Sequence, residues 1–241
     1  MAEPAGVHGA DLAGRTVVVT GASSGIGRAT ALACVRAGAV VHGLARRPAD
    51  GPFSSHRCDI TDPGEVATAV ARIAAPAGID GLVLAAGTNI AARRLDQLTI
   101  AGWEEVLGTN LSGAFAVFAA VLPHLRRARG DAIFISSVSG QWPDASGAAY
   151  QASKAGLIGL ARAAALEEHA RGVRVSSIMP GLVDTPLLDR RPQPPDPQQR
   201  TAALRPDDVA LACVFLLGLP ARVHIPELTI LPGAIQALGD T

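Results

Sequence analysis

The chain lacks an excess of charge of either sign, a long apolar run and an obvious cysteine framework. Its 241 residues include 21 basic and 21 acidic ones, so the net charge is zero, which argues against a nucleic-acid surface built on bulk charge. No uninterrupted apolar run reaches the ~18 residues of a membrane-spanning helix, and the first residues show no basic-then-apolar signal pattern. We expect a cytoplasmic protein that binds neither nucleic acid nor membranes.

Cysteines are few, and their spacing is uninformative. Cys34, Cys58 and Cys213 are odd in number and none forms a CxxC pair, which without a secretory signal predicts no disulfide framework. We expect each thiol to fill a small apolar gap. No cluster of histidines, cysteines and carboxylates has the spacing of metal ligands, so we predict no metal site.

Lysine, tyrosine and asparagine are also rare. Lys154 is the only lysine, and Tyr150, four residues before it, is the only tyrosine; the two asparagines are Asn89 and Asn110. Chance is one explanation for the isolated lysine. The other is that this position needs a compact ammonium with an adjustable pKa, which the planar guanidinium of arginine cannot supply.

Short apolar runs alternate with longer helical patterns along the chain. The runs are continuous, which is typical of parallel strands covered on both faces. Their alternation predicts right-handed βαβ crossovers, and hence one doubly wound α/β domain over residues 1–241 with a mostly parallel sheet of about seven strands. We expect strands at 16–20, 39–45, 54–58, 81–86, 132–136, 173–178 and 226–231, and helices at 25–37, 63–75, 99–127 with a bend near Asn110, 149–170 and 206–217.

Residues 189–205 interrupt this alternation. The run Arg-Arg-Pro-Gln-Pro-Pro-Asp-Pro has neither helical nor strand periodicity. Because the segment follows a strand, it should lie at the carboxyl edge of the sheet, where open α/β sheets bind ligands. A lid over the substrate and a flexible surface loop are both consistent with this position.

A glycine-rich turn, Thr20-Gly21-Ala22-Ser23-Ser24-Gly25-Ile26-Gly27, connects the first strand to the first helix. Its spacing is GxxxGxG, not the common GxGxxG. Glycines let a backbone turn tightly and approach a pyrophosphate, and the helix behind them offers free N–H groups at its positive end. The turn therefore predicts a dinucleotide site.

A second motif combines Ser137, Tyr150 and Lys154. The four-residue step places the tyrosine and the lysine on one helical face. A phenol with a pKa near ~10 is a poor base at neutral pH, and a nearby ammonium lowers that pKa. Ser137 closes a strand, so its hydroxyl can polarise a carbonyl oxygen. Two amphipathic side chains on a surface helix are the alternative, which the accompanying glycine turn disfavours.

From about residue 11 to residue 231, the chain resembles the short-chain dehydrogenase/reductase superfamily in its ~250-residue single-domain form. The matching pieces occur in family order: Thr20–Gly27, Cys58-Asp59-Ile60, Thr109-Asn110-Leu111-Ser112-Gly113, Ser137, Tyr150-Gln151-Ala152-Ser153-Lys154 and Pro180-Gly181-Leu182-Val183-Asp184-Thr185. Together these motifs are specific to the superfamily and say little about the substrate.

The resemblance implies a role for each motif. Tyr150 would be the general acid in reduction and the base in oxidation, Lys154 would bind the nicotinamide ribose and lower the Tyr150 pKa, and Ser137 would hold the substrate oxygen. Asn110 would bend its helix and hold a water linked to Lys154. Further cofactor contacts would come from Gly21, Ser23, Ser24, Gly25, Ile26, Gly27, Asp59, Ile60, Ala85, Ala86, Gly87, Pro180, Gly181, Val183 and Thr185.

Two motifs depart from the family pattern. Leu84-Ala85-Ala86-Gly87 stands where the family usually has Asn-Asn-Ala-Gly, so cofactor binding there would rest on backbone contacts. The family's final Asp-Gly-Gly is replaced by Ile225-Pro226-Glu227-Leu228-Thr229-Ile230-Leu231-Pro232. This ending resembles a branch that is often NADP-linked, although Leu231 replaces that branch's arginine.

The residues after the second strand indicate the cofactor. In a dinucleotide-binding sheet this strand tip faces the adenosine ribose, and a carboxylate there favours NAD. Here Arg46 and Arg47 follow the strand, and a guanidinium pairs with a phosphate through two hydrogen bonds. We predict an NADP(H)-dependent oxidoreductase acting on a ketone, aldehyde or secondary alcohol. The alternatives are an NAD-linked alcohol or polyol dehydrogenase and a non-catalytic NADP-binding regulator.

The substrate and the assembly are the least readable features. Trp142, Leu187 and Leu188 should lie near the cleft and suggest an apolar pocket, although plain core or lid packing is the favoured explanation for each. Arg190 and Arg191 could meet an anionic substrate, but a solvated loop is the favoured interpretation. Small residues on several faces of the 149–170 helix leave one face free to pack elsewhere, so we expect a homodimer or homotetramer.

Overall fold

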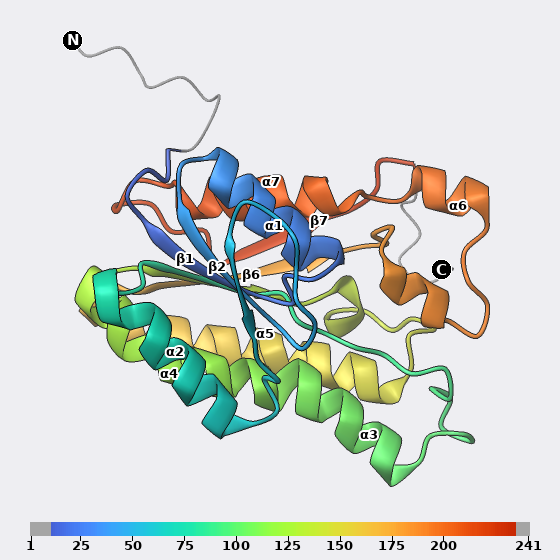
Figure 1. Cartoon of the computed structure of the whole chain (residues 1–241). Helices are drawn as coiled ribbons and strands as arrows, with labels where there is room; N and C mark the ends of the chain where they lie inside the picture. Colours follow the sequence, from blue (N-terminus) through green and yellow to red (C-terminus); the bar gives the residue numbers. More distant parts are fainter. Residues whose placement is uncertain (1–10, 235–241) are drawn as a thin grey trace.

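The computed structural model describes residues 11–234, apart from the side chains of residues 76 and 77. Its centre is one parallel sheet of seven strands in the order β3-β2-β1-β4-β5-β6-β7 (Figure 1). This confirms the predicted doubly wound, Rossmann-like domain. The strands are β1 (Thr16–Thr20), β2 (Val40–Ala45), β3 (Ser54–Arg57), β4 (Gly81–Leu84), β5 (Asp131–Ile135), β6 (Arg174–Pro180) and β7 (Glu227–Ile230).

The central strands are apolar because helices cover both of their faces. Every residue of β1, β4 and β5 is buried. In the register of the sheet, Thr20 at the end of β1 lies beside Leu44 of β2 and Leu84 of β4. The carboxyl ends of these strands therefore meet at one edge, which is where an open α/β sheet binds its ligands.

Two helical layers enclose the sheet, as Figure 1 shows. Helices α1 (Gly25–Arg36) and α7 (Pro206–Leu217) pack side by side on one face. The other face carries α2 (Pro63–Ala77), α3 (Ile100–Leu107), α4 (Gly113–Ala128) and α5 (Ala148–Glu168). Each layer buries its own apolar cluster against the sheet. Cys34, Cys58 and Cys213 are buried and free, as expected of gap-filling thiols, and burial raises the pKa of Cys34 to about 12.

The predicted helical region at 99–127 is interrupted where the bend was expected. Helix α3 ends at Leu107, and a π-helical turn, Gly108–Ser112, contains Asn110 before α4 begins. The continuous helical stretch Ile100–Ala128 is long and apolar enough to cross a membrane. This is only weak evidence of a membrane span, because the core helices of soluble proteins have the same length and composition. Val117, Val121 and Leu125 of α4 lie in the apolar cluster against the sheet, which accounts for much of this composition.

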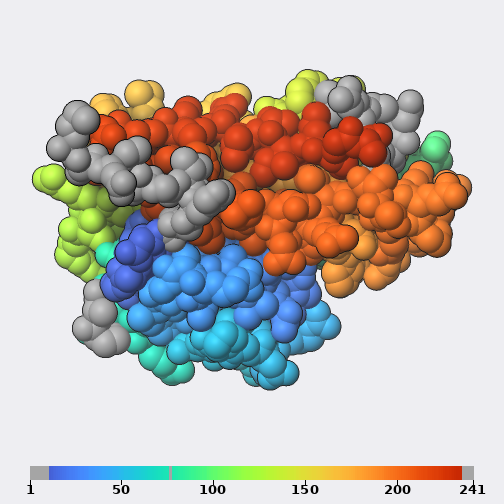
Figure 2. Space-filling model, turned by 90° about the horizontal axis from the view of Figure 1, so that it is seen from above, coloured from blue at the N-terminus to red at the C-terminus, as the bar shows by residue number. Residues whose placement is uncertain are grey.

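Residues 189–205 are more ordered than the sequence predicted. The segment begins in a 3₁₀ turn, Pro186–Arg190, and contains a short helix, α6 (Pro197–Ala202). A capping box starts that helix: Asp196 accepts from the backbone of Gln199, whose side chain accepts from the Asp196 N–H. We missed this signal because the prolines dominate the composition. In Figure 2 the segment, in orange, continues the face that carries α7.

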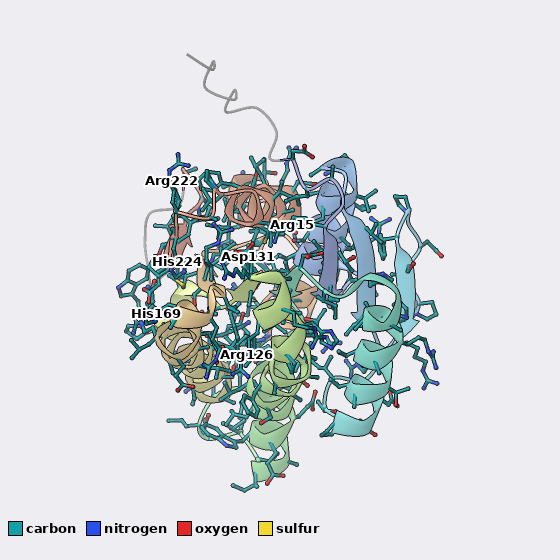
Figure 3. All side chains as sticks on the ribbon, turned by 90° about the vertical axis from the view of Figure 1, so that its left-hand side faces the viewer. Arg15, Arg126, Asp131, His169, Arg222 and His224 are labelled. Atoms are coloured by element: carbon teal, nitrogen blue, oxygen red, sulfur yellow. The ribbon has the colours of Figure 1, made fainter. Side chains whose placement is uncertain are left out.

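The amino ends of the strands are held by buried ion pairs. Asp131, at the start of β5, accepts from Arg15 at 2.7 Å and from Arg174 at 2.6 Å. Figure 3 views this edge and labels Arg15 and Asp131. The Asp131 side chain is only 7% exposed, so the pairs take the place of its lost hydration.

Candidate active site

Two adjoining hollows occupy the carboxyl edge of the sheet. The larger groove has a volume of about 310 Å³, and the smaller pocket a volume of about 110 Å³. Leu187 lines both hollows. The groove is otherwise lined by the glycine turn and the strand tips: Gly21, Ser23, Ser24, Leu44, Ala45, Arg46, Arg47, Cys58, Asp59, Ile60, Ala85, Ala86, Gly87, Thr88, Thr109, Pro186 and Arg190.

The glycine turn is packed so closely that side chains would not fit. Gly21 has a φ of +70°, and a Cβ there would come within 2.9 Å of the Ala86 Cα. A Cβ on Gly27 would lie 2.4 Å from the Gly21 carbonyl oxygen. Ser24 caps α1 without a side-chain hydrogen bond, so no hydroxyl occupies the first N–H groups of the helix. These groups can receive an anion, as the sequence predicted for a pyrophosphate.

The end of β4 is braced by a residue that the sequence analysis did not single out. The Thr20 hydroxyl oxygen accepts hydrogen bonds from the backbone N–H groups of Ala85 and Ala86, each at 3.0 Å. Thr20 is 1% exposed. Its hydroxyl therefore fixes the loop at the position where the family's asparagine is missing, and it holds one wall of the groove.

Tyr150, Lys154 and Ser137 converge between the two hollows. Ser137 and Tyr150 line the smaller pocket. Lys154 is 5% exposed, its Nζ donates to the Ile135 carbonyl oxygen at 2.9 Å, and it lies 5.6 Å from the centroid of the Tyr150 ring. A Cβ on Gly87 would be 3.7 Å from the Lys154 Nζ, so this ammonium lies beside the groove.

Burial dominates the acid–base properties of this pair. It raises the pKa of Tyr150 to about 12, which is opposite to the lowering that the sequence predicted. A hydrogen bond with the Ser137 hydroxyl and the charges of Arg191 and Arg93 oppose the rise. Burial also lowers the pKa of Lys154 to about 8. In this structure Tyr150 is therefore a phenol at neutral pH, ready to donate a proton.

Asn110 connects three elements from the π-helical turn. Its Oδ1 accepts from the Thr88 N–H at 2.7 Å, and its Nδ2 donates to the Thr88 carbonyl oxygen and to the Ser153 Oγ, each at 3.0 Å. The side chain is completely buried. Asn110 thus ties the loop after β4 to α5, one residue before Lys154. That it holds a water linked to Lys154 stays a prediction.

Most of the other predicted residues line one of the two hollows, whereas Gly25, Gly27 and Trp142 line neither. Arg46 and Arg47 are exposed on the rim of the larger groove, which Asp59 and Ile60 also line. A Cβ on Gly25 would contact Thr185 at 3.3 Å. Trp142 is 37% exposed and does not line the smaller pocket, so its contact with substrate stays a prediction. The predicted residues that do line this pocket are Ile26, Ser137, Tyr150, Pro180, Gly181, Val183, Thr185, Leu187 and Leu188.

Six polar residues of the smaller pocket were not predicted as site residues: Asn89, Arg93, Ser136, Ser139, Asp144 and Ser146. Arg93 and Asn89 come from the loop after β4, and Asp144 comes from the loop before α5. Arg93 is only 6% exposed. Nothing in the sequence distinguishes it from its neighbour Arg94, because its burial depends on how the loop folds against Gly147.

Comparisons with known proteins agree with this geometry. A family model described as short chain dehydrogenase matches residues 15–195. The chain is 35% identical over 250 residues to cis-4-hydroxycyclohexanecarboxylate dehydrogenase of Sinomonas cyclohexanicum, covering 95% of this chain and 100% of that one. It is 39% identical over 181 residues to 2,3-dihydro-2,3-dihydroxybenzoate dehydrogenase of Escherichia coli, covering 73% of each.

Solved structures share the fold. The alcohol dehydrogenase of the archaeon Thermococcus sibiricus, complexed with 5-hydroxy-NADP, superimposes with a TM-score of 0.82 at 26% identity, covering 92% of this chain and 98% of that one. The matched family, the matched fold and the convergence of Ser137, Tyr150 and Lys154 lead to one assignment. The chain belongs to the short-chain dehydrogenase/reductase family and is an oxidoreductase of alcohol or carbonyl groups that uses a nicotinamide cofactor.

Proposed function

We propose that the protein transfers a hydride between NADP(H) and a secondary alcohol, or its ketone or aldehyde, with Tyr150 as the acid–base group. The observation that carries the proposal is the shared position of the Tyr150 and Ser137 side chains in a small pocket beside the groove formed by the glycine turn. A reacting oxygen in this pocket can meet both hydroxyls while its carbon faces the groove.

The groove fits a dinucleotide. The spaces beside Gly21 and Gly27 exclude any side chain, and α1 presents N–H groups that no side chain caps. Gly21, Ser24 and Gly25 would hold the pyrophosphate, Asp59 and Ile60 would flank the adenine, and Lys154 would contact the nicotinamide ribose. When bound, the cofactor supplies or accepts the hydride.

In oxidation, the phenolate form of Tyr150 would accept the proton of the substrate hydroxyl while the bound cofactor took up the hydride. In reduction, the protonated Tyr150 would donate its proton to the carbonyl oxygen, and the cofactor would supply the hydride. Ser137 donates to the same oxygen and stabilises the charge that develops there.

The preference for NADP(H) rests on Arg46 and Arg47. Both are exposed at the tip of β2 and line the groove, and no carboxylate follows the strand directly. A 2′-phosphate there gains charge-assisted hydrogen bonds, whereas the hydroxyl of NAD gains less. Asp59 lies on the same groove; hydrogen bonds from the Thr61 N–H and hydroxyl lower its pKa most, and the nearby Arg46 contributes a smaller part. The Arg46 side chain thus lies near the place where the extra phosphate would bind.

The test compares kcat/KM with NADPH and NADH for the wild type, Arg46→Asp and the control Arg57→Asp. Arg57 is exposed at the end of β3 and does not line the groove, so it controls for the general change of charge. We expect the wild type to prefer NADPH, Arg46→Asp to lose this preference, and Arg57→Asp to retain it. Equal use of both cofactors by the wild type would contradict the preference and leave the reaction unaffected.

Self-association is a second part of the proposal. The outer surfaces of α4 and α5 carry Phe115, which is 53% exposed, and Leu166, which is 74% exposed. A Cβ on Gly159 would meet open space, so this side of α5 can be approached closely. We expect a homodimer or homotetramer in light scattering at micromolar concentration, and a smaller species for Phe115→Asp. A monomeric wild type would contradict it.

The substrate class and the compartment are finer questions. The two curated relatives are named for a hydroxycyclohexanecarboxylate and a dihydroxybenzoate, so both names combine a ring, hydroxyl groups and a carboxylate. That the protein is cytoplasmic, and binds neither membranes nor nucleic acid, stays a prediction. A movable lid at residues 189–205 is likewise a proposal, supported by the position of Arg191 in the lining of the smaller pocket.

A further inference from the structure

Two guanidinium groups face the pocket that holds the reacting hydroxyls. Arg93 comes from the loop after β4, and Arg191 directly follows the 3₁₀ turn Pro186–Arg190. Both line the smaller pocket together with Ser137 and Tyr150. A pocket that had only to hold an apolar ketone would gain nothing from two buried or half-buried cations.

Arg93 is fixed in place. Its Nε donates to the Ile90 carbonyl oxygen at 3.0 Å, and its Nη2 donates to the Arg190 carbonyl oxygen at 3.2 Å. A Cβ on Gly147 would lie 2.7 Å from the Arg93 Cβ, so the two backbones pack without slack. The loop after β4 and the segment after β6 are thereby joined through this one side chain, which leaves little freedom for the guanidinium to turn away.

The Arg93 guanidinium forms no ion pair within the part of the chain that the structure describes. No carboxylate oxygen among residues 11–234 lies within 4.0 Å of the Arg93 or the Arg191 guanidinium. Arg93 is nevertheless only 6% exposed. A buried charge without a partner is costly, and proteins normally pair it.

Asp144 is the acidic group in this pocket, and it is already engaged. One of its carboxylate oxygens accepts from the Ser139 hydroxyl, and the other accepts from the Ser146 N–H at 2.9 Å. Two cations and one anion therefore line the pocket. Burial and the neighbouring Arg191 lower the pKa of Arg93, and Tyr150 and Asp144 offset part of this.

We propose that the substrate is a hydroxy- or oxo-carboxylate whose carboxylate is bound by Arg93 and Arg191 while its reacting oxygen faces Tyr150 and Ser137. This inference rests on the proposed function, because it assigns the other end of the same substrate. A guanidinium binds a carboxylate through two parallel hydrogen bonds, and this geometry orients the substrate as well as holding it. The redox step is unchanged, and the carboxylate takes no part in it.

The first test uses paired compounds: straight-chain and ring hydroxycarboxylates, each with its primary amide. The amide keeps the shape and removes the charge. For at least one pair, we expect kcat/KM for the acid to exceed that for the amide by about 100-fold or more, because the amide leaves the cations unpaired. Equal use of acid and amide in every pair that the wild type oxidises would overturn the inference.

Variants assign the preference to residues. We expect Arg93→Gln and Arg191→Gln each to reduce the acid-over-amide ratio at least about tenfold, mainly through KM. Arg94→Gln is the matched control, since the Arg94 side chain is 75% exposed and pairs with Asp96. Arg94→Gln should keep the acid-over-amide ratio of the wild type. Arg191 is less buried than Arg93, so its variant remains informative if Arg93→Gln fails to fold. A full ratio in a folded Arg191→Gln protein would overturn its assignment.

A binding measurement separates this inference from the proposed reaction. We expect the hydroxycarboxylates, but not their amides, to raise the melting temperature of the wild type with cofactor present, and not that of Arg191→Gln. If the wild type turns over neutral alcohols with no preference for acids, the inference fails and the proposed function stands. If nothing is turned over but the acid-specific shift occurs, the proposed function fails and the carboxylate site stands.

Discussion

The Lys154 ammonium lies 5.6 Å from the centroid of the Tyr150 ring and donates a hydrogen bond to the Ile135 carbonyl oxygen, not to the phenol. The hydrogen bond to Ile135, the last residue of β5, therefore positions the lysine, whose ammonium lies beside Gly87 at the groove. Under the proposed function this arrangement separates two roles: Lys154 would bind the ribose of the cofactor, while Tyr150 would exchange a proton with the substrate.

Removing the Tyr150 hydroxyl should abolish proton transfer and leave binding intact. We expect Tyr150→Phe to reduce kcat by at least the ~10²–10⁴-fold typical of acid–base groups. The ring still fills the pocket, so the dissociation constant of the cofactor, measured by fluorescence titration, should change less than about threefold. Near-normal turnover by this variant would refute the acid–base assignment.

The two directions of the reaction should differ in their dependence on pH. Burial raises the pKa of Tyr150 to about 12, so the phenol keeps its proton throughout the neutral range. Reduction uses the protonated form and should be nearly constant between pH 6 and about 9. Oxidation uses the phenolate. As long as the pH is below the pKa, the phenolate fraction increases about tenfold for each unit by which the pH rises. Values of kcat at saturating cofactor should show oxidation rising from pH 7 to 9; a flat or falling profile would contradict this.

Much of the fold could be predicted because the signals were local and redundant. The apolar runs of β1 and β5 are buried on both faces, so their composition reports their position directly. β4 was predicted to reach residue 86, but it ends at Leu84 because the next two N–H groups donate to the Thr20 hydroxyl. The capping box at Asp196 was readable and was overlooked among the prolines.

The candidate site was predictable where a motif specifies a position, and not where tertiary packing does. The four-residue step correctly placed Tyr150 and Lys154 on one side of α5, but the sequence does not show how deeply a side chain is buried. Burial dominates the pKa of Tyr150 and raises it, whereas we had predicted that the pKa would be lowered. Arg93 illustrates the same limit, because its burial follows from contacts with Gly147 and the Arg190 carbonyl group, which are distant in sequence.

Burial of the Lys154 ammonium should reduce the free energy of unfolding of the protein. Burial lowers its pKa from 10.5 to about 8, so the folded state holds its proton less tightly than the unfolded state. The destabilisation caused by burying the Lys154 ammonium is therefore complete below about pH 8. It decreases as the pH rises from about 8 to 10.5, and it disappears above 10.5. We expect Lys154→Met to raise the free energy of unfolding at pH 7 by roughly 1–2 kcal/mol, after allowing for the lost bond to Ile135.

Urea unfolding of the wild type and Lys154→Met at pH 7 and pH 10 measures this effect. The gain should be largest at pH 7 and smaller at pH 10, and the variant should be inactive at both. A variant less stable than the wild type at pH 7 would show that the ammonium contributes more through its hydrogen bond than its burial costs.

The Thr20 hydroxyl should couple the stability of the sheet to the shape of the groove. It accepts from the N–H groups of both Ala85 and Ala86 and is almost completely buried, so Thr20→Val leaves two donors without a partner. An unsatisfied buried donor costs about 1–3 kcal/mol; because Ala85 and Ala86 are only half-buried, we expect the two lost bonds together to reduce the free energy of unfolding by an amount in this range. The freed loop lines the groove, so cofactor affinity should fall as well, by about tenfold.

Thr20→Ser keeps the hydroxyl and should retain most of both the stability and the cofactor affinity of the wild type. Thr16→Val, a buried threonine at the opposite end of β1, controls for the loss of a hydroxyl from this strand and should leave cofactor affinity unchanged. Equal cofactor affinity in Thr20→Val and the wild type would show that the backbone of the loop holds its shape without the bracing hydroxyl.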